Sequence, residues 1–389
     1  MQLSKYKLGE LLDVSRGASL SGEFYSSAGE LIRLTLGHFD YQNGGFKENT
    51  SKDNLYFVGP VKSQFILNEG DIITPLTEQT PGLLGSTAMI PKSEKYIQSQ
   101  DVALIRCKED KLDPMFCYYL LPSKIVKSQL GAAAQQTKIR HTTPDRIKDV
   151  IVFIPELEEQ RRIGVTLHSI DRKIALNREI NRNLEAMVET ITDFVLASKP
   201  TASKRINQFA SVKAGGDCPK SFSKEYIDGD LIPIYSNGIV NDGLYGYTAD
   251  YTKSIQERSV TVSARGTIGA SFIRMERFIP IIRLIAITPN EKGGDVWIHQ
   301  MIKRMVFENN GSVQQQLTVP EISKFIIPYP QEETIAEYER MTTPLVETIF
   351  RNQKEISDLQ KQRDELLPLL MNGQVSVMPT EVNCDLSHD

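Results

Sequence analysis

The residues that most often carry out chemistry in proteins are few in this chain, and they share no spacing typical of a site. Five histidines and four cysteines lie far apart: His38, His141, His168, His299, His388, Cys107, Cys117, Cys218 and Cys384. No C-x-x-C pair occurs, so neither a zinc site nor a redox dithiol is indicated. Scattered, unpaired thiols favour a reducing cytoplasm.

Motifs of the common enzyme classes are also missing. The sequence contains no G-x-x-x-x-G-K-[ST] loop, no H-E-x-x-H, no G-x-G-x-x-G after a strand and no G-x-S-x-G. An Asn/Asp-Pro-Pro-aromatic methyltransferase motif has no match either. Because acidic residues are plentiful, a nuclease or methyltransferase site without a recognisable motif stays open as an alternative.

One polar loop combines basic residues with a histidine. Residues 131–147 read GAAAQQTKIRHTTPDRI, with Lys138, Arg140 and His141 close together. Such side chains can contact phosphates or base edges, so His141 is a candidate for this contact. The competing interpretation is an ordinary surface histidine.

The elements that must position such residues occur twice. Apolar positions at alternating steps of four and three, the repeat of a coiled-coil seam, run from residue 163 to 195. The spacing recurs 175 residues later, where Ile349 matches Ile174 and Asn352 matches Asn177. As polar seam residues, the two asparagines would fix the register of paired helices. The predicted seam comprises Ile163, Leu167, Ile170, Ile174, Asn177, Leu184, Ile191, Leu345, Ile349, Asn352, Ile356, Leu359 and Leu366.

Two similar helices most simply pack on each other, although packing of each helix on its own block is the competing interpretation. The sequence predicts them over about 171–197 and 345–371, each roughly 40 Å long at ~1.5 Å per residue. Thr343 and Pro344 resemble a cap and a first helical residue, which predicts a break before the second helix.

A globular block of short strands precedes each helix. Turn signals separate strand-like runs in the first block, at 30–36, 54–59, 70–75, 86–91 and 101–107. A helix is predicted from Pro114 to Leu130, ended by Gly131. The second block repeats this order, with strand-like runs in 259–270 and 280–289. Many short strands and few helices predict an α+β fold.

The length of 389 residues suits two domains with connecting helices. The predicted boundaries are 1–155 for the first block, 156–199 for the central helix, 200–330 for the second block, 331–373 for the C-terminal helix and 374–389 for a tail. No apolar run approaches the ~20 residues that span a membrane, and no secretory signal is evident. We therefore expect a cytoplasmic protein without membrane contact.

The net charge of −4 is unevenly distributed. Residues 331–389 carry a net charge of −7, whereas residues 1–154 carry +1 and residues 200–330 carry +3. Near-neutral blocks can still present a basic face. The charge therefore permits a nucleic-acid partner without requiring one.

In its order of features, the chain resembles the DNA specificity subunit of type I restriction-modification enzymes over about residues 5–377. The most specific similarities are Ile154-Pro155 before Glu158-Glu159-Gln160, Ile327-Pro328 before Glu332-Glu333, the helix end Leu370-Met371-Asn372-Gly373, and the block openings Ser15-Arg16-Gly17 and Val212-Lys213-Ala214-Gly215. The second copy departs at Thr334, where the family usually has glutamine.

The resemblance implies two tandem target recognition domains, each reading half of a bipartite site in double-stranded DNA. The two long helices would pair as an antiparallel coiled coil that sets the gap between the half-sites. It further implies a subunit without catalysis, cofactor or metal of its own. Two methyltransferase subunits that use S-adenosylmethionine would dock on it, and restriction/translocase subunits requiring ATP and Mg²⁺ can join.

Base-reading residues should be polar or basic loop residues, with Arg suited to guanine and Asn or Gln to adenine. The candidates are Arg16, Ser19, Gln79, Thr80, Lys138 and Arg140 in the first block, and Lys213, Lys220, Asn237, Arg265, Gln314, Gln315 and Gln316 in the second. Gly266 would let the backbone beside Arg265 approach a phosphate. A rival hypothesis is a coiled-coil interaction protein with two ligand-binding blocks and no DNA role.

Overall fold

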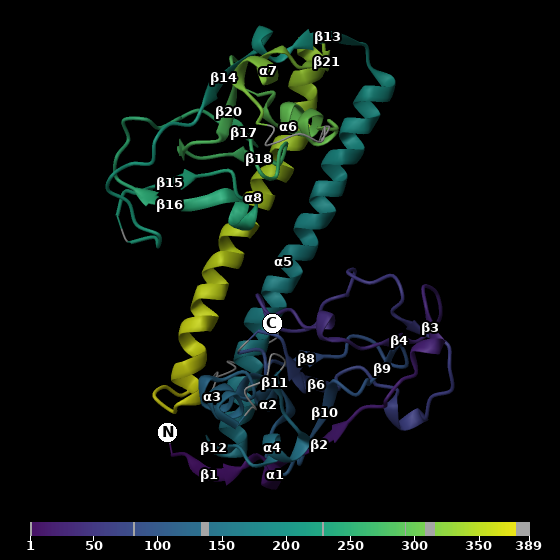
Figure 1. The fold of residues 1–389 in the computed structure, drawn as a ribbon. Helices are drawn as coiled ribbons and strands as arrows, with labels where there is room; N and C mark the ends of the chain where they lie inside the picture. Colours follow the sequence, from purple (N-terminus) through teal and green to yellow (C-terminus); the bar gives the residue numbers. More distant parts are fainter. Residues whose placement is uncertain are drawn as a thin grey trace, which may run out of the picture. The chain divides into compact units, whose positions relative to one another are not determined.

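The computed structural model describes residues 2–80, 82–133, 140–227, 229–291, 293–307 and 316–378. The chain divides into two compact units, unit 1 (Met1–Ile174 with Ser357–Asp389) and unit 2 (Ala175–Ile356). Each unit contains one block and a part of both long helices (Figure 1). Within the described part of the chain, no helix is both long and apolar enough to cross a membrane.

A four-stranded antiparallel sheet forms the centre of unit 1, in the order β2 (Leu12–Arg16), β10 (Val102–Cys107), β6 (Ile72–Pro75) and β8 (Ala88–Met89). Successive side chains of a strand point to opposite faces. Ala103 and Ile105 accordingly pack in one core cluster, and Val102 and Leu104 pack in another. Both faces of this sheet are therefore buried.

Smaller elements complete unit 1. A second sheet has the order β3 (Tyr25–Ser26), β5 (Tyr56–Phe57), β4 (Ile32–Arg33) and β9 (Tyr96–Ile97). Two strand pairs join β1 (Ser4–Lys7) to β12 (Ile151–Ile154) and β7 (Thr77–Glu78) to β11 (Arg140–His141). The short helices are α1 (Leu8–Leu11), α2 (Pro114–Leu120), α3 (Lys124–Ala133) and α4 (Pro144–Lys148).

The prediction of one helix from Pro114 to Leu130 is wrong, because α2 and α3 are separate helices. The predicted start is right: Asp113 caps α2 by accepting a hydrogen bond from the Phe116 amide at 2.9 Å. Pro122 lies between the helices, where it lacks an amide hydrogen and disfavours helical geometry in the residue before it. The second helix then continues past Gly131.

Unit 2 repeats the order of the central sheet. Its central sheet runs β14 (Ala210–Ala214), β20 (Leu284–Pro289), β17 (Ser259–Ser263) and β18 (Ser271–Arg274). The second sheet runs β16 (Leu244–Thr248), β15 (Ile232–Tyr235) and β19 (Ile279–Pro280), and β13 (Thr201–Arg205) pairs with β21 (Ile326–Pro330). The short helices are α6 (Asp295–Lys303) and α7 (Val319–Lys324). The predicted α+β fold with two similar blocks is confirmed.

Both long helices, α5 (Leu157–Ser198) and α8 (Glu332–Met371), are continuous and extend beyond the predicted pieces 171–197 and 345–371 (Figure 1). The predicted break at Thr343-Pro344 is therefore wrong. The Thr343 hydroxyl donates to Glu339 Oε2 at 3.1 Å, and that of Thr348 donates to the Pro344 carbonyl at 2.8 Å. The next turn is held by packing of Leu345 and Val346 against the core of unit 2. Each helix is roughly 60 Å long at ~1.5 Å per residue, so the 40 Å prediction was too short.

The two helices pair antiparallel within each unit. In unit 2, Thr192 Oγ1 lies 2.9 Å from Tyr338 Oη, and the Asn177 amide donates to Glu355 at 2.8 Å. In unit 1, Arg363 donates to Asp171 at 3.0 Å. Contacts that come later along α5 come earlier along α8, so the predicted antiparallel pairing is confirmed.

The structure places every predicted seam residue in a buried or half-buried position. Those with the lowest exposure are Ile163, Leu167, Ile170, Ile174 and Asn177; the half-buried ones are Leu184, Ile191, Leu345, Ile349, Asn352, Ile356, Leu359 and Leu366. The two asparagines have different partners, because Asn352 donates to Asn181 Oδ1 at 2.8 Å while Asn177 binds Glu355.

Each block also packs against both helices. In unit 1, Ile163 and Leu167 of α5 share a core cluster with Leu370 of α8. In unit 2, Val188 of α5 shares one with Trp297 of α6 and Tyr338 of α8. A block is thus completed by a helix segment from the other half of the sequence, which packing on its own block alone does not explain.

Candidate nucleic-acid interface

Both central sheets end in the same construction, a tight turn that leads into the middle strand. We call the turn at residues 99–102 with its adjoining strand ends the unit 1 edge. The turn at residues 281–284 with its adjoining strand ends is the unit 2 edge. In each edge a glycine, Gly17 or Gly215, follows the outer strand and lies against the turn. A Cβ atom on either glycine would lie 2.3 Å from a carbonyl oxygen of the turn, that of Ser99 or Ile281.

The edges share a backbone hydrogen-bond pattern. Four contacts in unit 1 have counterparts in unit 2: Val102 N to Ser99 O (3.1 Å) and Leu284 N to Ile281 O (3.1 Å); Leu76 N to Asp101 O (2.8 Å) and Ala264 N to Arg283 O (2.9 Å); Ala18 N to Gln98 O (3.0 Å) and Gly216 N to Pro280 O (3.2 Å); Thr142 N to Leu76 O (2.9 Å) and Leu317 N to Ala264 O (2.9 Å). Equivalent residues can therefore be assigned without relying on sequence similarity.

This equivalence shows how the side chains differ. Arg16 at the end of β2 corresponds to Ala214 at the end of β14. In the turns, Asp101 corresponds to Arg283. The backbone of the edge is thus conserved between the units, while its charged groups are redistributed.

In the unit 1 edge, Arg16 is exposed and its Nε donates to the Gln100 carbonyl at 2.8 Å. This bond orients the guanidinium, and the described residues provide no partner for its two Nη groups. Ser19, Gln79 and Thr80 are also exposed. The structure therefore places these four predicted residues where DNA could reach them.

Glu78 holds the loop that carries Gln79 and Thr80, and sequence reasoning missed it. The residue is 1% exposed, and its Oε2 accepts hydrogen bonds from the amides of Leu83 at 2.8 Å and Leu84 at 3.0 Å. Its other oxygen lies 3.2 Å from Arg140 Nη1. Nothing in the run TPLTEQTPGLLG distinguishes a buried acid from an exposed one.

Arg140 is engaged within unit 1. Besides Glu78, its guanidinium contacts the Gly131 carbonyl, and the side chain is half-buried. The neighbouring His141 is exposed and occupies the position that corresponds to Gln316 in unit 2. The third predicted residue of this loop, Lys138, lies outside the described residues.

In the unit 2 edge, the structure brings Asn237, Arg265 and Gln316 together. The Asn237 amide donates to the Arg265 carbonyl at 2.8 Å, and the Asn237 carbonyl accepts from Ser263 Oγ at 3.0 Å. Gln316 is exposed and precedes Leu317, which binds Ala264. Asn237 therefore positions the backbone of Arg265.

The remaining predicted residues of unit 2 are more dispersed. Lys213 is exposed on β14, and Lys220 is exposed in the loop that follows this strand. No contact joins Lys220 to the edge within the described residues. Gln314 and Gln315 lie outside them.

Arg283 is a second residue that sequence reasoning missed. It is exposed and occupies the third position of the 281–284 turn, with a positive φ of 73°. In the sequence it interrupts the apolar run PIIRLIAI, whose hydrophobic pattern predicts a single strand. The signal was a single arginine between two strands, β19 and β20, that the structure separates by this turn.

Positive charge at the unit 2 edge is not neutralised internally. Within the described parts of the chain, Lys213, Arg265 and Arg283 have no ion-pair partner. Two other arginines of unit 2 are paired, Arg258 with Asp295 and Arg304 with Asp193, both at 2.8 Å. Unpaired cations on loops suit phosphate and base contacts.

Another arginine of unit 2 is structural. Arg274 is buried, stacks over the Tyr235 ring at 3.5 Å and donates to Thr261 Oγ1 at 2.9 Å. Burial lowers the pKa of its guanidinium and raises that of the nearby Asp242 carboxyl. Arg274 is therefore not available to DNA.

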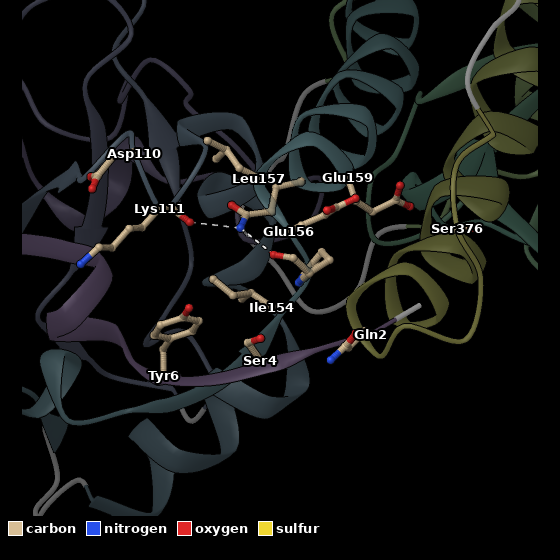
Figure 2. Close-up of a pocket in the computed structure, with 12 residues that line it drawn as sticks. Gln2, Ser4, Tyr6, Asp110, Lys111, Ile154, Glu156, Leu157, Glu159 and Ser376 are labelled. Carbon is tan, nitrogen blue, oxygen red and sulfur yellow. Dashed lines mark hydrogen bonds between the residues drawn. The ribbon is translucent and has the colours of Figure 1, made fainter.

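A cavity of about 710 Å³ lies at the start of α5 in unit 1, lined by Ser4, Tyr6, Lys111 and Glu156 among others (Figure 2). Gln160, one of the residues that carried the resemblance, donates to the carbonyls of Lys111 at 3.1 Å and Pro155 at 2.9 Å. None of the predicted DNA-binding residues lines it. Among the described residues, no cluster of His, Cys, Asp or Glu could hold a metal ion.

Comparison with known proteins gives one consistent family. The family described as "Type I restriction modification DNA specificity domain" matches residues 2–186 and again 199–374. A putative type I specificity subunit of Mycoplasma pneumoniae is 24% identical over 376 residues, covering 93% of this chain and 95% of the relative. The specificity subunit of the type I restriction enzyme MjaIX of Methanocaldococcus jannaschii is 21% identical, covering 67% and 69%.

A solved structure shows the same fold. The S subunit of a type I restriction-modification system from M. genitalium superimposes with a TM-score of 0.69 at 16% identity. The match covers 95% of this chain and 96% of that subunit.

Proposed function

The chain belongs to the type I restriction-modification DNA specificity family, and we propose that it recognises a bipartite DNA sequence, with one half-site at each edge. Both edges present polar and basic side chains on a rigid backbone frame. Direct readout depends on which side chains reach the base edges. One frame with two sets of side chains therefore suits a target whose halves differ.

The observation that carries this proposal is the duplicated edge. Four matched backbone hydrogen bonds fix the same geometry in both units, whereas Arg16 and Arg283 occupy non-equivalent positions. A coiled-coil interaction protein without a DNA role would need no such duplicated, unneutralised loop surface. The rival hypothesis is for this reason not favoured.

We further propose that the chain acts as an assembly subunit without catalysis of its own. Two methyltransferase subunits would dock on it and supply S-adenosylmethionine chemistry, and a nuclease/translocase using ATP and Mg²⁺ can join them. This part rests on the family, in which a specificity subunit is named separately from the enzymes. Incubating the isolated chain with DNA, Mg²⁺ and S-adenosylmethionine should yield neither cleavage nor methylation; either product would refute the proposal.

DNA recognition is tested by gel shift of the complex between this chain and its host's methyltransferase subunits. We expect selective retention of a duplex carrying a bipartite site. A duplex with both half-sites scrambled is the matched control. Equal retention of the two duplexes would reject sequence-specific recognition.

The helix pair is proposed to set the gap between the half-sites. Inserting one heptad into α5 alone should damage pairing, because the seam contacts with α8 shift out of register. A matched insertion in both helices should restore pairing and lengthen the recognised gap. An unchanged gap in the methylome of the matched variant would reject this role.

A further inference from the structure

Arg283 stands out at the unit 2 edge because its backbone conformation is unfavourable for an arginine. A positive φ at the third position of a turn favours glycine or asparagine, since a side chain meets the backbone there. Bulky residues kept in this conformation cluster at functional sites, where the surrounding structure holds them. The stability of the turn therefore does not explain why an arginine occupies this position.

The surroundings of Arg283 fix its backbone from both sides. Its carbonyl accepts from the Ala264 amide at 2.9 Å, and the next residue, Leu284, donates to Ile281 at 3.1 Å to close the turn. The close approach of Gly215 to the Ile281 carbonyl fills the space behind the turn. The side chain therefore extends from an immobilised base.

The guanidinium itself has no role inside the protein. It is exposed, and the described residues provide it with neither an ion pair nor a hydrogen bond. Arg265 adds a second unpaired cation one backbone contact away, through Ala264. An exposed, unpaired guanidinium on a rigid turn is suited to bidentate recognition of an external acceptor.

Unit 1 also has an arginine at the turn, but this arginine comes from the neighbouring strand. There Arg16 reaches over the turn from β2 and its Nε binds Gln100, the counterpart of Ile282. In unit 2 the position of Arg16 is Ala214, which is too short to reach the turn. Each edge thus has one arginine at the turn, from β2 in unit 1 and from the turn itself in unit 2.

We propose that Arg283 is a base-reading residue of unit 2 that specifies a G·C pair in its half-site. It would take the role that we expect Arg16 to have in unit 1, although the two residues occupy non-equivalent positions. Guanine O6 and N7 present the two acceptors that a guanidinium binds in a bidentate manner. This inference rests on the proposed DNA recognition and adds the residue and the base to it. Asn237, whose amide is used on the Arg265 carbonyl, is a positioning residue in this scheme.

The test uses the full chain with its host's methyltransferase subunits and compares methylomes of the wild type, Arg283→Gly and Arg283→Lys. Glycine adopts the positive φ without steric cost, so Arg283→Gly should retain the turn and the wild-type melting temperature. It should lose discrimination at a single G·C pair of one half-site, by roughly 10- to 100-fold. The other half-site should stay unchanged.

Arg283→Lys retains the charge but lacks the planar fork, so it should lose the same discrimination with little change in salt dependence. If Arg283→Gly fails to fold, Arg283→Lys alone tests whether Arg283 specifies the base pair. Lys324→Ala, which removes an exposed cation on α7, is the matched control and should leave the motif unchanged.

Two results would overturn the inference: an unchanged motif in both Arg283 variants, or an equal loss of binding to all sequences, which marks a phosphate contact. A wild-type methylome without any bipartite motif would instead reject the proposed function itself. The two failures are therefore distinguishable.

Discussion

The unit 1 edge and the unit 2 edge have the same backbone and different chemistry. Four matched hydrogen bonds and two equivalent glycines fix the frame in both. Beyond it, unit 1 has a long loop held by the buried Glu78, whereas unit 2 has Gly266 at that position and a short connection from β17 to β18. The comparison indicates that the main chain provides a common scaffold. Loop length and charged side chains then determine which target each edge would recognise.

The ends of the helix pair show a similar division. In unit 1, Asp171 accepts from Tyr119 at 2.7 Å and from Arg363 at 3.0 Å, which is an ionic network. In unit 2, a buried pair of hydroxyls joins the helices, with Thr192 against Tyr338 and the Trp297 ring 5.0 Å from that of Tyr338. The same antiparallel pairing is therefore stabilised in two chemically different ways.

The largest expected difference between the edges comes from Glu78. Replacing it with alanine should destabilise unit 1 by about 3 kcal/mol, because a buried charge pair loses one partner and two amides lose their acceptor. Glu78→Gln retains an acceptor oxygen and should cost less. Chemical denaturation measures both, and a Glu78→Ala chain as stable as the wild type would contradict the assigned role of the loop anchor.

The shared frame predicts equal rather than different effects at the two glycines. Gly17→Ala and Gly215→Ala should each destabilise their own unit by about 2 kcal/mol, since the new Cβ meets a carbonyl oxygen. Thermal unfolding of the two variants provides the measurement. If one substitution were tolerated and the other not, the equivalence of the edges would be wrong.

Each unit also contains a histidine whose pKa is lowered by burial from 6.5 to about 4, the buried His38 in unit 1 and the half-buried His299 in unit 2. Both accept protons more readily when unfolded, so their contribution to stability is present above pH 6.5 and is lost as the pH falls towards 4. Each histidine should lower the free energy of unfolding by about 1 kcal/mol when the pH falls from 7.5 to 5.5.

Denaturation at the two pH values checks this. His299→Gln should remove about half of the pH dependence if the units respond alike. An undiminished dependence would show that other groups cause it.

The smallest expected effect concerns phosphate contact. Lys213 corresponds to Ser15 in unit 1, so only unit 2 places an exposed cation at this strand position. Lys213→Ala should weaken binding to all sequences and reduce the slope of log K against log salt by about 0.9. Ser15→Lys should increase that slope by a similar amount. Salt titrations in which neither variant changed the slope would place both residues away from the DNA backbone.

The sequence predicted the duplication, the repeated succession of strand-like runs and the seam well, because repeats and hydrophobic periodicity are local signals. It failed where tertiary packing outweighs local preference. Pro344 suggested a break, yet packing of Leu345 and Val346 on unit 2 maintains a continuous helix. Pro122 was overlooked inside an otherwise helical pattern.

For the candidate interface, loop position and residue type singled out Arg16 and Arg265, which the structure places near the two edges, but not the residues defined by three-dimensional contacts. Glu78 reads as an ordinary polar loop residue, and only its burial shows its role. Arg283 lies within an apolar run, and only its backbone angle and exposure identify it. The pairing of Arg140 with a buried acid likewise has no local signature.

The proposal that each edge reads one half-site is tested most directly by the methylome of a host in which this chain is the sole specificity subunit. We expect adenine methylation within one motif of two specified half-sites separated by a fixed number of unspecified bases. A single continuous motif, or no motif dependent on this chain, would contradict it.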